Sequence, residues 1–74
     1  MPPLKVGQRF QYISGYGRKR LIGEILLVHE PTGHVSIKIV QIQDWFGILI
    51  GTIYNDEHMD SDFWTYLEGQ DSPT

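Results

Sequence analysis

Two apolar arms flank a short polar segment over the stretch 21–42, and this pattern predicts a long β-hairpin. Over 35–39, Val, Ile and Ile alternate with Ser and Lys, as expected when successive side chains point to opposite faces of a sheet. The run Glu-Pro-Thr-Gly at 30–33 is typical of a tight turn, because proline pre-sets φ for a type I turn and glycine accepts the left-handed conformation that follows. A three-residue loop with a glycine bulge would pair Glu30 with His34.

That pairing determines which side chains share a face of the hairpin. It places Leu27 opposite Ile37 and Ile25 opposite Ile39, so we expect these four residues in the core. Five aliphatic residues then fall on the outer face, where a small sheet would leave them in water: Ile22, Leu26, Val28, Val40 and Ile42. Alternatively, Gly23 marks a bend at a barrel corner, beyond which the inner and outer faces exchange.

Three shorter strands are expected around the hairpin, over 9–13, 48–54 and 63–67. Trp45 and Phe46 stand together before the second of these strands, and alternation sends one of the two outside. That ring is exposed or covered by another chain, unless the pair caps the open end of a barrel. Since no window of ten or more residues has a helical period, the predicted fold class is all-β, with five strands and a long central β-hairpin.

Length and composition predict one small domain over 1–68 and a disordered polar tail over 69–74. A domain of 74 residues has a marginal core and gains from a partner, so we expect a homo-oligomer. The lack of cysteine excludes disulfides and thiolate metal sites. Because the sequence has neither a secretory pattern at its start nor the roughly 20 apolar residues of a membrane span, we expect a cytoplasmic protein. The formal charge of −3 argues against a protein that coats nucleic acid.

A glycine-rich loop that bears Tyr16 precedes Arg18, Lys19 and Arg20, named here the basic triplet. Clustered cations beside such a loop can hold phosphate oxygens while an aromatic ring stacks on the ligand. The alternative is a solvated hairpin loop, since two glycines without a third or a following helix do not form a dinucleotide fingerprint. The expected ligand-binding residues are Tyr16, Arg18, Lys19, Arg20, Trp45 and Trp64.

No metal site, cofactor or catalytic signature is predicted. The acidic segment 55–62 lacks EF-hand spacing: counted from Asp56, a histidine takes the third position and a serine the sixth, where an oxygen ligand and a glycine are needed. His29 and His34 flank the predicted turn and are expected on the surface, because zinc normally takes three or four protein ligands. The carboxylates cluster in a predicted loop and not in a dry pocket, so we do not expect an enzyme.

The opening Val6-Gly7-Gln8-Arg9-Phe10 and the later Gly51-Thr52-Ile53-Tyr54, together with five short strands, resemble an SH3-like small β-barrel. The closing Phe-Trp-Thr-Tyr-Leu at 63–67 also resembles the short barrels that bacteriophages and prophages encode. This resemblance implies a phage accessory protein in the host cytoplasm, acting by binding against a host defence factor or a nucleotide signal. The acidic-aromatic groove motif of eukaryotic SH3 domains is absent, so proline-rich peptide recognition is not implied.

Two functions remain as hypotheses. The first is a non-enzymatic binding module that sequesters an anionic small ligand, such as a nucleotide, or blocks a host protein. The alternative is a protein interaction or assembly module that uses exposed aromatic residues and an outer aliphatic patch. The expected interface residues are Ile22, Leu26, Val28, Val40, Ile42 and Phe46.

Overall fold

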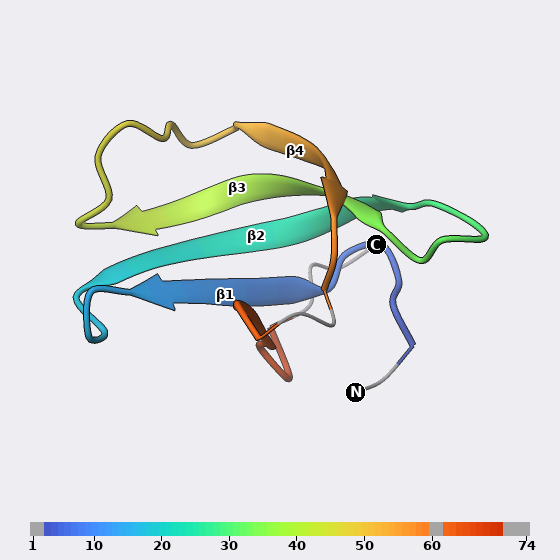
Figure 1. Ribbon diagram of the computed structural model, residues 1–74, viewed down its shortest axis with the longest axis horizontal. Helices are drawn as coiled ribbons and strands as arrows, with labels where there is room; N and C mark the ends of the chain where they lie inside the picture. The colour runs from blue at the N-terminus through green and yellow to red at the C-terminus, as the bar shows by residue number, and fades with distance from the viewer. Residues whose placement is uncertain (1–2, 60–61, 71–74) are drawn as a thin grey trace.

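The computed structural model describes residues 3–59 and 62–70. Within these ranges the chain forms five strands of one antiparallel sheet, in the order β4-β3-β2-β1-β5, and no helix (Figure 1). The all-β prediction is therefore confirmed, as is the long central hairpin, which is formed by β2 and β3. The strands are β1 (Arg9–Ser14), β2 (Lys19–Val28), β3 (Val35–Gln43), β4 (Ile53–Glu57) and β5 (Trp64–Tyr66).

The two edge strands, β4 and β5, are not paired with each other in the described part of the chain, so the sheet does not close into a barrel. After β4 the chain crosses from one edge of the sheet to the other before it enters β5 (Figure 1). Met59 lies on this connection and is buried in the core cluster. Met59 thus covers part of the core without a strand pairing, and the described residues form an open sheet.

The predicted hairpin register is wrong by one residue at the turn. His29 and His34 close the loop, since the His29 N–H donates to the His34 carbonyl at 2.7 Å. The Gly33 N–H also donates back to the His29 carbonyl, at 2.8 Å, where Gly33 has a left-handed φ of 79°. Four residues, 30–33, therefore separate the closing pair instead of the expected three, and the pairing Glu30–His34 does not form.

Two register shifts in the hairpin change which side chains are buried. One lies between Ile22 and Gly23 and the other between Ile25 and Leu27. Each bulge puts an extra residue into one strand, so that the face assignment changes beyond it. Leu27, expected in the core, is 52% exposed, and Ile22, expected on the outer face, is only 4% exposed. The shift beside Gly23 agrees with the alternative that this glycine marks an exchange of faces. The shift between Ile25 and Leu27 has no such signal, because alternation does not indicate a bulge.

The rest of the predicted core is confirmed, because Ile25, Ile37 and Ile39 are fully buried. The expected outer aliphatic patch is divided, however. Leu26 and Phe46 are exposed, Val40 is half-buried, and Val28 and Ile42 are partly buried against the core. The buried residues of the described core are Phe10, Leu21, Ile25, Val35, Ile37, Ile39, Met59 and Trp64.

The fourth strand begins later than predicted. Residues 44–52, named here the β3–β4 loop, replace most of the expected strand 48–54, and the stretch 55–57 is strand instead of polar loop. Gly51 adopts a left-handed φ of 96°, which an extended strand cannot contain. Its N–H donates to the Ile39 carbonyl, and the Ile39 N–H donates to the Thr52 carbonyl, both at 2.8 Å, so the end of the loop is fixed to β3.

Two further predictions concern the ends of the chain and membranes. Most of the expected disordered tail, residues 71–74, lies outside the described residues. Among the residues that the structure does describe, there is no helix with the length and apolar character needed to cross a membrane.

Candidate ligand-binding pocket

A row of paired residues across three strands forms one wall of a pocket. Tyr12 of β1 pairs with Trp64 of β5 on one side and with Leu21 of β2 on the other. Residues directly opposite each other in antiparallel strands point to the same face, so the three side chains lie together. The Tyr12 and Trp64 rings are 5.3 Å apart at 73°, an edge-on contact. The strand register thus places a tyrosine between a tryptophan and a leucine.

The β3–β4 loop adds Trp45 and Ile48. Asp44 has a φ of 52°, a conformation that aspartate tolerates better than most residues, and it turns the chain at the end of β3. Trp45 then meets the Tyr12 ring edge-on, with centroids 5.5 Å apart at 76°. The next residue, Phe46, is 92% exposed. The prediction that one of these two adjacent rings points outward is confirmed.

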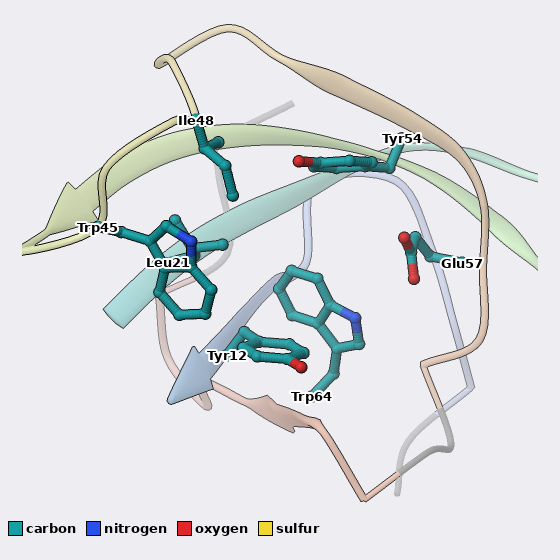
Figure 2. A pocket seen from close by; sticks show the side chains of 7 residues that line it. All are labelled: Tyr12, Leu21, Trp45, Ile48, Tyr54, Glu57 and Trp64. Carbon is teal, nitrogen blue, oxygen red and sulfur yellow. The ribbon is translucent and has the colours of Figure 1, made fainter. Parts of the chain in front are cut away.

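Strand β4 contributes Tyr54 and Glu57. Tyr54 pairs with Ile37 and Glu57 pairs with Val35, and both partners are fully buried. Since paired residues share a face, this register directs the Tyr54 ring and the Glu57 carboxylate toward the inner side of the sheet. The two residues reach the same space as the rings of β1, β5 and the loop (Figure 2).

Together these segments surround a pocket of about 170 Å³ (Figure 2). It is slightly larger than an engineered cavity of about 150 Å³ that holds benzene. Trp45 and Ile48 are only half-buried, so this wall of the pocket reaches the surface. The described residues that line it are Tyr12, Leu21, Trp45, Ile48, Tyr54, Glu57 and Trp64.

The lining combines aromatic rings with a carboxylate. Four of its seven described residues are aromatic, and ring faces carry the negative part of the aromatic quadrupole. Among the described lining residues Glu57 supplies the acidic group, and no lysine, arginine or histidine lines the pocket. The electrostatic environment therefore favours a positive group over a negative one.

The structure brings together only part of the predicted ligand site. Trp45 and Trp64 both line the pocket, whereas Tyr16 and the basic triplet do not. Tyr16 is fully exposed on the β1–β2 turn, with a left-handed φ of 59°. Arg18 and Lys19 are also exposed, whereas the Nε of Arg20 is buried without a hydrogen-bond partner in the described part of the chain.

Sequence reasoning missed Tyr12, Tyr54 and Glu57 as site residues. Tyr12 lies within the predicted strand 9–13, and a place in a strand gives no indication of a pocket beside it. Glu57 was assigned to a solvated loop because the start of β4 was misplaced. The usable signal was the surplus of aromatic residues near Trp45 and Trp64, which exceeds what a small sheet hides.

A second polar cluster lies near the hairpin loop. His34 Nδ1 and Asp56 Oδ1 are 2.6 Å apart, and this hydrogen bond and the charge of His34 hold the pKa of Asp56 below its usual value. The His34 ring lies 3.7 Å from that of His58, and His29 is hydrogen-bonded to Ser36. Within the described ranges, however, no group of three or more His, Cys, Asp or Glu side chains is arranged to hold a metal ion.

Comparisons of this chain with protein-family models, with curated proteins and with solved structures found no match. The function of the pocket is therefore inferred from its own chemistry.

Proposed function

We propose that this protein is a non-enzymatic binding module and that the aromatic pocket is its ligand site. The observation that carries the proposal is the convergence of four aromatic side chains from four separate segments of the described chain. Tyr12 comes from β1, Trp45 from the β3–β4 loop, Tyr54 from β4 and Trp64 from β5. Segments so far apart in the sequence meet around one space only through the tertiary fold.

The position of the pocket distinguishes it from a packing defect. A packing defect is a void enclosed in the core, and protein interiors contain few voids larger than a water molecule. This pocket instead opens to solvent beside the half-buried Trp45 and Ile48, so a ligand can reach it. Apolar surface that leaves water on binding contributes about 25 cal/mol per Å², and the aromatic walls of the pocket supply such surface.

The chemistry of the lining favours recognition over catalysis. It supplies aromatic faces, two tyrosine hydroxyls and one carboxylate among the described residues. Nucleophilic catalysis requires a nucleophile within hydrogen-bond reach of an activating base, and no hydrogen bond joins Glu57 to either tyrosine hydroxyl in the described part of the chain. A pocket of this size also suits a single chemical group of a ligand, since drug-sized ligands occupy about 300–1,000 Å³.

We further propose that the domain is an SH3-like accessory module of the bacteriophage type. The five short antiparallel strands and the long hairpin support this proposal. In this view the connection after β4, with Met59 in the core, takes the place of barrel closure.

A titration of ¹⁵N-labelled protein with a panel of small cationic, neutral and anionic compounds tests the pocket. We expect at least one class to shift the indole N–H signals of Trp45 and Trp64 together, because both rings line the same space. Trp45→Ala should abolish these shifts at Trp64. Phe46→Ala is the matched control, because its exposed ring is adjacent in sequence but does not line the pocket. Indole signals that respond to no compound would contradict the proposal.

A second candidate is an anionic group, such as a nucleotide phosphate, bound by the basic triplet. The buried Nε–H of Arg20, which has no acceptor in the described part of the chain, favours it. A phosphate oxygen is a strong acceptor for a guanidinium N–H. In the same titration an anionic compound would then shift the backbone amides of residues 18–20 and leave both indoles unchanged.

A further inference from the structure

We propose that the aromatic pocket binds a quaternary ammonium group, such as the trimethylammonium of choline or of a methylated lysine. This inference rests on the proposed function of the pocket and specifies its ligand class. A cation held over aromatic faces is attracted by the ring quadrupole, and the attraction grows when the cation leaves water. The pocket supplies the required faces and, in Glu57, a counter-charge.

The ring geometry suits a cage. Trp45 and Trp64 each stand nearly at right angles to the Tyr12 ring, at 76° and 73°, with centroids 5.5 and 5.3 Å away. Phe63 stacks on one face of Tyr12, at 5.7 Å and 13°, and does not line the pocket. The perpendicular rings of Trp45 and Trp64 can therefore bound a space on the sides that this stack leaves open. Tyr54 and Ile48 lie on the opposite side of the pocket from Tyr12 (Figure 2). A roughly spherical group can then contact several walls at once.

The lining selects a methylated ammonium over an unmodified one. A primary ammonium is strongly hydrated and needs several hydrogen-bond acceptors when it leaves water. The described lining is mostly carbon and offers few acceptors besides Glu57. Methyl groups cover the charge of a quaternary ammonium with apolar surface, which these walls can contact. The carboxylate can still balance the charge without a direct hydrogen bond.

The surrounding charges agree with a cationic ligand. An anion would have to lie beside Glu57 without a compensating cation in the lining, which is costly in a desolvated site. Arg20 is adjacent to Leu21 in β2, and successive strand residues point to opposite faces, so its side chain leaves the sheet away from the pocket face. The chain as a whole carries a formal charge of −3.

The β3–β4 loop indicates how a larger ligand would reach the pocket. The loop directs Trp45 and Ile48 into the pocket and exposes Phe46, Leu49 and Ile50. These exposed apolar residues are neighbours in sequence of two pocket residues, and they suit a polypeptide that inserts a methylated lysine, whereas free choline would contact the pocket alone. The two sources share the trimethylammonium chemistry and differ in their need for the exposed residues of the loop.

Calorimetric or NMR titration with two compounds of matched shape tests the charge. Choline and 3,3-dimethylbutan-1-ol differ in having nitrogen or carbon at the branched centre. We expect choline to bind at least about tenfold more tightly. Glu57→Gln and Trp45→Leu should each reduce this preference, the first by removing the counter-charge and the second by removing a π face while keeping an apolar wall. Glu30→Gln is the matched carboxylate control, because Glu30 is exposed on the hairpin loop.

A peptide with one trimethyl-lysine, compared with its unmodified form, tests the source. We expect the methylated peptide to bind more tightly than choline and the double variant Leu49→Ala, Ile50→Ala to weaken the peptide alone. Equal binding of choline and its neutral analogue overturns the ammonium inference but leaves a binding pocket in place. Failure of every compound to shift the Trp45 and Trp64 indoles overturns the pocket function itself.

Discussion

Gly23 of β2 lies so close to the Ile37 side chain of β3 that a Cβ would overlap it. Alanine at Gly23 therefore tests the packing of the central hairpin. A Cβ on Gly23 would lie 2.6 Å from both Cγ1 and Cδ1 of Ile37. Carbon atoms in contact are normally about 3.5–4.0 Å apart, so Ile37 would have to move by roughly 1 Å. Ile37 is fully buried in the core cluster, so neighbouring core side chains have to absorb this movement.

The expected cost of Gly23→Ala follows from this contact. Overpacking a core costs about 1–3 kcal/mol. Alanine recovers about 0.4–1 kcal/mol by restricting the unfolded chain, because the φ of Gly23 lies outside the left-handed region. The middles of these two ranges give a net loss of about 1.3 kcal/mol. Each kcal/mol lowers Tm by roughly 4–8 °C in a domain of this size.

A double-mutant cycle identifies the cause. Ile37→Ala alone should cost about 2–5 kcal/mol as a large-to-small core change. It also removes both clashing atoms, so Gly23→Ala with Ile37→Ala should be at least about 1 kcal/mol more stable than the sum of the two losses. Urea unfolding measures each free energy, and an unchanged m-value supports the comparison.

Leu21 provides the control for this cycle. It is buried in the same core cluster, but it pairs with Ile42 and not with Ile37, and none of its atoms is among those nearest to the added Cβ of Gly23. Gly23→Ala combined with Leu21→Ala should therefore be additive. Additivity with Ile37 as well, or no loss of stability for Gly23→Ala, would refute the close approach of β3 to Gly23.

Three further predictions concern charge and assembly. His34→Ala should raise the pKa of Asp56 toward 3.8, as measured by ¹³C NMR of the carboxylate. Because folding lowers the pKa of Asp56, the His34–Asp56 pair stabilises the fold at pH values above the unfolded pKa, and this stabilisation is lost as the pH falls through the folded pKa. The free energies of unfolding of variant and wild type should therefore converge at low pH. An unaltered titration of Asp56 in the variant would show that the pair is absent. Replacing all three residues of the basic triplet with glutamine should leave Tm nearly unchanged but abolish nucleotide binding, which in the wild type should weaken with salt; binding that persists contradicts the anion site. Leu26 is exposed on β2, so Leu26→Glu should dissociate a homo-oligomer without unfolding the domain. Sedimentation at micromolar concentration measures this, and a monomeric wild type would exclude self-association through the outer aliphatic patch.

The sequence by itself determined the local structure of this protein. Alternation over 35–39 is a property of neighbouring residues, so β3 could be predicted without knowing its partners. The same alternation placed Ile37 and Ile39 on one face, and both are fully buried. The sequence also predicted Trp45 and Trp64 as ligand-binding residues, because it has more aromatic rings than a five-stranded sheet can bury.

Only the tertiary structure decided which of these residues face each other. The two bulges in the β2–β3 pair change which side chains point to the inner face of the sheet. As a result Ile22 is buried and Leu27 is exposed. Strand β4 begins only after the left-handed Gly51 and extends to Glu57. Its pairing with β3 then places Glu57 opposite Val35 and at the pocket. A pocket needs side chains from distant segments to converge, and this convergence depends on strand register and sheet curvature, which no local period encodes.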